Sequence, residues 1–185
     1  EQDPLRLEAI LSGNSYKLKT DQIIQVSGKI GFGIQAIDLL DGATNKCGIY
    51  SLQLSIDNTV IYSFKMDDYA ISESKYVNAH IDYERAVRSG QRLYKTWIEP
   101  GNKLGIYDEV VKHAIFKADD NQLHDVKFVV ADVAGNTSTI AFKIKSTELE
   151  MPKKEPKGEL FRYNHDNRIK TDEIEFSVPE GALYN

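Results

Sequence analysis

The sequence predicts a mainly β protein: an antiparallel β-sandwich with at most one short helix, plus a β-hairpin fragment at its C-terminal end. Apolar and polar residues alternate with a period of two through much of the 185-residue chain, as they do in strands with one buried face. Turn-forming residues separate these runs, which is typical of strands joined by short connections. Hydrophobic residues make up 41% of the chain and charged residues 28%, which is an ordinary globular composition.

Two strands are expected in the N-terminal part of the chain, over residues 22–26 and 30–40. Gly31 and Gly33 interrupt the second run. Glycine inside a strand marks a bulge or a close approach to the backbone, so this strand is expected to be irregular.

A hairpin is predicted over residues 51–66. Apolar residues alternate through 51–57 and again through 60–66. Asp57 and Asn58 lie between the two runs, and both residue types tolerate the positive φ that a tight hairpin turn needs.

The segment after this hairpin is less regular and holds the one expected helix. Residues 82–88 can form two helical turns, with Asp82 as the N-cap and Gly90 as the stop. A strand is expected to follow over residues 92–99.

A second hairpin is predicted from alternation in residues 126–130 and 140–144. Gly135 and Asn136 favour the left-handed backbone of its turn, and Asp132 can accept backbone N–H bonds across it. Six residues on the apolar faces of the two hairpins are predicted to share one core: Leu52, Leu54, Phe128, Val130, Ile140 and Phe142.

The domain organisation follows from a change in composition near residue 148. Residues 1–147 are predicted to form the sandwich, and 148–158 a charged linker that contains two prolines. Residues 159–185 hold strand-like runs at 160–163 and 174–178. Two strands are too few to enclose a core, so this part is predicted to be the truncated start of a second β domain.

Charge and composition exclude some functions. The formal net charge is −5 and no basic cluster occurs, which argues against a nucleic-acid partner. No apolar run reaches the length of a transmembrane helix. Cys47 is the single cysteine, so it forms no internal disulfide. The abrupt start at Glu1 is interpreted as a trimmed N-terminus, with any export signal upstream.

Motifs for cofactors and catalysis are weak. Gly31, Gly33 and Ala36 match a dinucleotide fingerprint, but an antiparallel hairpin follows where a parallel βαβ unit is required. The four histidines do not form a compact zinc-binding pair. No Gly-x-Ser-x-Gly elbow occurs, and Cys47 is interpreted as a small apolar residue. We therefore expect no cofactor and no catalytic residues.

Two binding sites are weighed against structural alternatives. Asp119, Asp120, Asn121 and Asp125 form an oxygen-rich loop that could hold calcium, although their spacing is not that of an EF-hand and such residues are common in turns.

Trp97, with Tyr94 and Tyr107 as neighbours, is the candidate ligand contact, because aromatic rings stack on sugars. A single tryptophan in a sandwich is more often part of the core, and we favour that interpretation.

Seven segments, in this order, resemble a known region. They are residues 27–34, 48–54, 73–78, 81–83, 98–104, 132–138 and 179–184. From about residue 16 onward the chain resembles the region that follows the catalytic domain in large exported lysostaphin-type zinc peptidases of Gram-negative bacteria. The resemblance implies an immunoglobulin-like β-sandwich.

The family holds its zinc with His-x-x-x-Asp and His-x-His, and neither pattern occurs in this sequence. No catalytic residue is carried over, and the peptidase domain either lies outside the chain or has been lost. The resemblance implies a non-catalytic accessory module, periplasmic or attached to the envelope, that positions or docks neighbouring domains on peptidoglycan. The alternative is an adhesion or glycan-binding domain of a bacterial surface protein.

Overall fold

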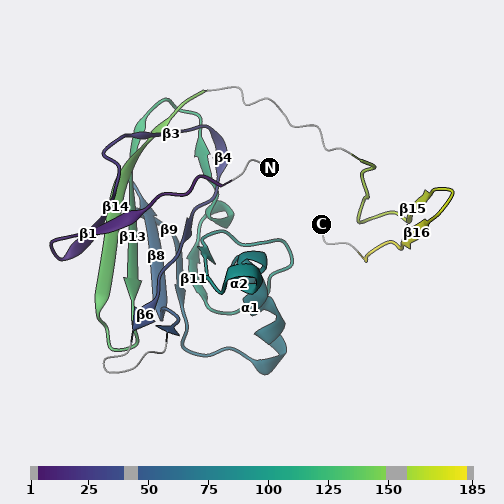
Figure 1. Ribbon diagram of the computed structural model, residues 1–185, viewed down its shortest axis with the longest axis horizontal. Helices are drawn as coiled ribbons and strands as arrows, with labels where there is room; N and C mark the ends of the chain where they lie inside the picture. Colours follow the sequence, from purple (N-terminus) through teal and green to yellow (C-terminus); the bar gives the residue numbers. More distant parts are fainter. Residues whose placement is uncertain (1–3, 40–45, 149–157, 183–185) are drawn as a thin grey trace.

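A large sheet forms the main layer of the computed structural model, which describes residues 4–39, 46–148 and 158–182. The sheet has eight strands, and Figure 1 shows its longest strands side by side. Seven follow one another in space in this order: β1 (Ala9–Ser12), β2 (Ser15–Leu18), β14 (Thr137–Ser146), β13 (Leu123–Ala131), β8 (Ser51–Ile56), β9 (Thr59–Lys65) and β11 (Tyr107–Val110). The eighth, β3 (Ile24–Val26), also pairs with β14. The predicted mainly β, antiparallel-rich fold is confirmed.

Both predicted hairpins of the large sheet are present. β8 and β9 are joined by Asp57 (φ 50°) and Asn58 (φ 65°). β13 and β14 are joined through Asp132, whose carboxylate accepts the Asn136 backbone N–H at 2.8 Å, and through Gly135 at φ 89°. The residues of each turn therefore determine the strand register of its hairpin.

The pairing of β14 departs from a purely antiparallel sheet. Its outer edge is covered by two strands that run parallel to it: β2, with Ile140 opposite Tyr16, and β3, with Ile144 opposite Ile24. Parallel neighbours need a long connection, and here most of the sandwich lies between them in the sequence. Local alternation carries no signal for such a distant pairing.

A second, less regular layer packs on one face of the large sheet. It contains two short antiparallel pairs, β4 (Gly28–Ile30) with β12 (Phe116–Ala118) and β5 (Gly33–Ile34) with β10 (Tyr94–Lys95). The expected long strands over 30–40 and 92–99 are therefore wrong in extent. The chain changes partners at Gly31, so β4 and β5 pair with different strands. A further short pair is formed by β6 (Asp38–Leu39) and β7 (Lys46–Cys47).

The core lies between the two layers. Leu52, Leu54 and Phe128 are buried as predicted. Val130, Ile140 and Phe142 are only half-buried but pack against the same cluster. A T-shaped contact between Phe32 and Phe128, with ring centroids 6.3 Å apart, joins the layers. This arrangement is consistent with a β-sandwich.

The helical segment is larger than the single helix expected. α2 (Tyr83–Ser89) is the predicted helix: Asp82 accepts the Arg85 N–H at 3.0 Å and Gly90 ends it at φ 68°. It is preceded by a 3₁₀ turn, η1 (Ile71–Tyr76), and by α1 (Val77–His80), which the sequence did not predict. α1 is held by tertiary packing, because His80 is buried against Phe64. A further short 3₁₀ turn, η2 (Lys112–Ala114), lies between β11 and β12.

None of the helices that the structure describes is long and apolar enough to cross a membrane.

The C-terminal segment forms the predicted hairpin with a different first strand. β15 (Asn167–Lys170) pairs with β16 (Glu175–Val178), so residues 160–163 are not a strand. The Asn167 side chain closes a loop by bonding the backbone of Arg162. Among the described residues, the turn, loop and side-chain hydrogen bonds of residues 158–182 stay within that segment. Most of the predicted linker, 149–157, lies outside the described residues, and the domain boundary stays a prediction.

Candidate functional site

The three aromatic residues predicted to contact a ligand do not form one exposed platform. Tyr94 is 4% exposed, and its hydroxyl accepts the Ile49 N–H at 3.3 Å. Tyr107 is half-buried, and its hydroxyl accepts from Asn102 Nδ2 at 2.9 Å. Burial raises the pKa of Tyr107 to about 12. Both rings pack on His80 and belong to the core.

Trp97 is half-buried, and on the second layer its side chain is hydrogen-bonded in a group of three with Glu99 and Lys95. Its indole N–H donates to Glu99 Oε1 at 3.1 Å, and the same oxygen accepts from Lys95 Nζ at 2.8 Å. The Lys95 hydrogen bond is the main cause that holds the pKa of Glu99 below its usual value. The ammonium also lies 5.5 Å from the Trp97 ring centroid. Trp97 is thus partly exposed to solvent, whereas Tyr94 is buried and cannot share a surface ligand contact with it.

The glycine-rich segment has a packing reason at Gly31, where a side chain would collide with Trp97. A Cβ at this position would lie 2.8 Å from Trp97 Cε3, so the indole packs directly on the backbone. The expected close approach is confirmed. The segment leads into an antiparallel pair between β5 and β10, which lacks the parallel βαβ context of a dinucleotide site.

The oxygen-rich loop weighed as a calcium site is occupied by protein donors. Asp119 pairs with Lys117, and Asp125 pairs with Lys143 at 2.6 Å. Asp120 accepts from His124, while the Asn121 side chain accepts the Glu148 N–H at 3.2 Å. Within the described residues, no three His, Cys, Asp or Glu side chains are arranged so that they could hold a metal ion.

A buried histidine clamp was missed by the sequence analysis. His124 is 7% exposed, with Nδ1 2.6 Å from Asp57 Oδ2 and Nε2 3.1 Å from Asp120 Oδ1. Burial disfavours its charged form, but the two carboxylates outweigh burial and raise the pKa of His124. Asp57 also accepts the Asp125 backbone N–H at 2.9 Å. The clamp therefore ties the β8–β9 turn to the loop before β13.

A signal for this residue exists in the sequence. His124 precedes Val126 and Phe128 at a spacing of two, so alternation places it on the inner face. A polar residue in such a position needs partners. Its partners lie far away in the chain or in a loop, which is why the sequence does not name them.

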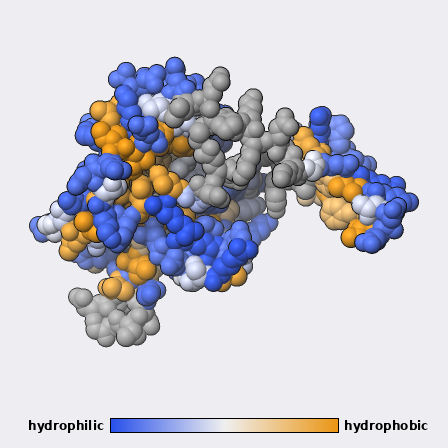
Figure 2. Space-filling model, turned by 45° about the horizontal axis from the view of Figure 1, so that its top comes forward, coloured by the Kyte–Doolittle hydropathy of each residue, from blue (hydrophilic) through white to orange (hydrophobic). Residues whose placement is uncertain are grey.

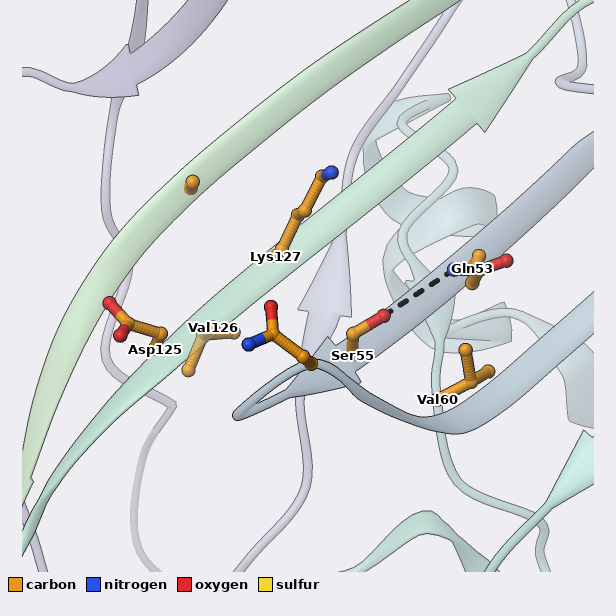
Figure 3. Close-up of a pocket in the computed structure, with 8 residues that line it drawn as sticks. Gln53, Ser55, Val60, Asp125, Val126 and Lys127 are labelled. Carbon is orange, nitrogen blue, oxygen red and sulfur yellow. Dashed lines mark hydrogen bonds between the residues drawn. The ribbon is translucent and has the colours of Figure 1, made fainter.

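The outer face of the large sheet carries an open hollow of about 400 Å³ (Figure 3). Figure 3 shows Lys127 on β13 beside Gln53 and Ser55 on β8. The lining residues are Gln53, Ser55, Asn58, Val60, Asp125, Val126, Lys127 and Ala141. The Gln53 amide donates to Ser55 Oγ at 3.4 Å. Solvent-facing polar residues are common on strands, so alternation alone does not distinguish this hollow from any other outer face.

The hollow offers groups for binding. Lys127 has no ion-pair partner among the residues that the structure describes, and amide and hydroxyl groups surround it. Comparisons of the chain with protein families, curated proteins and solved structures found no match. The fold and the arrangement of these side chains are therefore the basis for a functional proposal.

Proposed function

We propose that this chain is a non-catalytic accessory module of an exported cell-wall metallopeptidase, which positions or docks neighbouring domains in the periplasm or at the envelope. The family resemblance of its ordered sequence segments supports the proposal. The observation that carries it is the strand order, which is compatible with an immunoglobulin-like module.

The pairing of the strands supports an immunoglobulin-like fold in this proposal. The order β14-β13-β8-β9 has the arrangement of strands G, F, C and C′, with β11 in the place of C″. β4 pairs with β12 as strand B pairs with strand E. Immunoglobulin-like domains commonly serve as interaction modules, although a fold alone does not determine function.

The electrostatic contacts also support a structural role. Asp57 and Asp120 hold His124, Glu99 holds Lys95, and Asp132 holds its own turn. Each of these carboxyl groups has a lowered pKa, against the effect of burial in the case of Asp57, because nearby donors stabilise its charge. Shifted pKa values often mark catalytic sites, but structural networks produce them as well. Here Asp57 and Asp120 join two loops through His124, Asp132 closes a turn, and Glu99 holds side chains of the segment just before it.

The test joins this chain to the catalytic domain of a lysostaphin-type peptidase and measures muropeptides released from purified sacculi. The fusion should release them at least about tenfold faster than the catalytic domain carrying a flexible linker of equal length, because docking raises the effective substrate concentration. The chain alone should release none and bind no stoichiometric zinc. Equal rates for fusion and linker control would contradict docking, and release by the chain alone would contradict the non-catalytic role.

A second candidate is an adhesion or glycan-binding domain of a surface protein. The open hollow beside Lys127 favours this function, as does the partly exposed ring of Trp97. Glycan binding without any effect on a fused peptidase would favour this second candidate.

A further inference from the structure

We infer that the outer face of the large sheet binds a carboxylate-bearing glycan across two neighbouring hollows that meet at Ala141. The inference rests on the proposed contact with envelope glycan and assigns it to this face rather than to Trp97. It follows from the shape of the face, the charge of its lining and the pairing of the strands beneath it.

The two neighbouring hollows together are called the path. The first has a volume of about 400 Å³ and lies over β8 and β13. The second, of about 230 Å³, lies between β14 and the chain that joins β2 to β3. Ala141 lines both, so the two hollows are neighbours on the sheet. The path therefore suits an elongated ligand.

The charge along this path favours an anionic ligand. Asp125, the carboxylate of the first hollow, is paired with Lys143 at 2.6 Å. Lys127 in the first hollow and Lys17 in the second have no carboxylate within ion-pair distance among described residues. The ammonium groups of Lys127 and Lys17, one in each hollow, are thus left for ligand carboxylates, and one carboxylate, that of Asp21, also lines the second hollow. Charge complementarity of this kind steers a ligand and fixes its position.

Strand pairing favours a glycan over an extended peptide. Peptides commonly bind sheets by adding a strand at a free edge. β13 lies between β8 and β14, with Lys127 opposite both Ser55 and Ala141. The backbone of β13 under the first hollow is already paired on both sides, so the groups offered to a ligand there are side-chain amides, a hydroxyl and an ammonium group. These groups suit the hydroxyls and carboxylates of a sugar chain.

The histidine clamp holds one end of the path in place. His124 bonds Asp57, which precedes Asn58 in the turn, and Asp57 bonds the backbone of Asp125. Asn58 and Asp125 both line the first hollow. A wall fixed before binding loses less conformational freedom when a ligand arrives.

The experiment titrates the full ¹⁵N-labelled chain at low salt with four probes and follows amide shifts. The probes are a disaccharide-tetrapeptide muropeptide, trigalacturonate, neutral chitotetraose and the free tetrapeptide. We expect at least one of the two carboxylated glycans to shift the side-chain amides of Gln53 and Asn58 and the backbone amide of Lys127. Chitotetraose and the tetrapeptide should bind about tenfold more weakly, because each lacks one part of the recognised chemistry.

Matched variants test the charge. Lys127→Gln should weaken binding about tenfold, whereas Lys127→Arg should bind nearly as well as the parent chain. Lys103→Gln removes an exposed lysine outside the path and should have no effect. Circular dichroism checks that each variant is folded.

The inference is wrong if neutral chitotetraose or the free tetrapeptide binds as tightly as both carboxylated glycans. It is also wrong if the shifts centre on the Trp97 indole.

The fused peptidase separates this inference from the proposed function. If the module docks through this path, Lys127→Gln should reduce the rate advantage of the fusion, and Lys103→Gln should leave it unchanged. A full rate advantage with Lys127→Gln would overturn the path while leaving the accessory role in place. If no fusion shows a rate advantage, the accessory role is wrong. The glycan titration would then still test whether the path binds a glycan.

Discussion

Two buried histidines experience opposite environments in this protein. His80 is 1% exposed and lies edge-on to Phe64, with ring centroids 4.5 Å apart. Burial lowers the pKa of His80 to about 4, so the ring stays neutral. His124 lies between two carboxylates, which raise its pKa. The same side chain therefore has a lowered pKa in one place and a raised pKa in the other.

The clamp predicts an alkaline loss of stability. His124 has a raised pKa in the folded state, so its contribution is fully present below the unfolded value near 6.5 and declines as pH rises through the folded pKa. His124→Gln should lower the free energy of unfolding at pH 6 by about 1–3 kcal/mol, because the carboxylates lose a charged donor. Urea unfolding at pH 6 and pH 9 measures this. The difference between parent and variant should shrink at pH 9, and exposed His165→Gln should show no such change.

His80 predicts an acid loss of stability. Its folded pKa of about 4 lies below the unfolded value of 6.5. The unfolded state therefore binds the proton first, and stability falls as pH drops from 6.5 to 4, by up to about 3 kcal/mol. His80→Phe keeps an aromatic ring without a titrating group. Its unfolding free energy should depend less on pH in this window, as followed by urea unfolding; an unchanged slope would mean that other groups set it.

At the scale of elements, the sequence predicts well what local chemistry determines. The turn at Asp57 and Asn58, the turn at Asp132 and the cap at Asp82 all depend on neighbours a few residues away. α1 was missed because distant aromatic residues hold it, and the long strand over 30–40 was wrong because its partners change at Gly31. The outer hollow was missed because it depends on which strands lie side by side.

The contact between Gly31 and Trp97 gives a test of how closely the second layer is packed. Gly31→Ala places a methyl group 2.8 Å from the indole, and overpacking of this kind costs about 1–3 kcal/mol. Chemical denaturation followed by tryptophan fluorescence reports both stability and the indole environment. Gly33→Ala is the control, because its methyl group meets the flexible Leu93 side chain at 3.3 Å. Equal effects of the two substitutions would argue against the indole contact.

The register of β13 can be tested at one core position. Phe128 is buried, and Phe128→Ala should cost about 3–5 kcal/mol of unfolding free energy. Leu123→Ala changes a residue on the opposite face of the same strand that is 51% exposed, so its effect should be much smaller. Urea denaturation compares the two. A loss below about 1 kcal/mol for Phe128→Ala would mean that the strand faces the other way.

At the scale of the whole molecule, the C-terminal hairpin is a two-faced unit. Ile169 and Phe176 are opposite each other and share a face with Val178, while Arg168 and Glu175 pair on the other face. Phe161 stacks on Phe176, with ring centroids 6.0 Å apart, yet Phe176 remains exposed. Figure 2 shows this apolar surface. Two strands alone bury little apolar surface, so the exposed face invites association.

Deletion of residues 148–185 tests the predicted boundary. The melting temperature of the sandwich should hardly change, and analytical ultracentrifugation should show less self-association than in the full chain. The reason is that the deleted part carries an exposed apolar face, whereas the core of the sandwich lies in residues 24–144. A large fall in melting temperature by calorimetry would show that the C-terminal segment stabilises the sandwich and that the boundary is wrong.

The parallel pairing of β3 with β14 has a mechanical consequence. Val26 lies opposite Ser146 and Ile24 opposite Ile144, so the two strands run side by side in the same direction. Tension applied before β3 and after β14 pulls them in opposite senses along their common axis. The bonds between them are then loaded together in shear instead of opening one after another. A sandwich connected in this way resists stretching when it is pulled between its two ends.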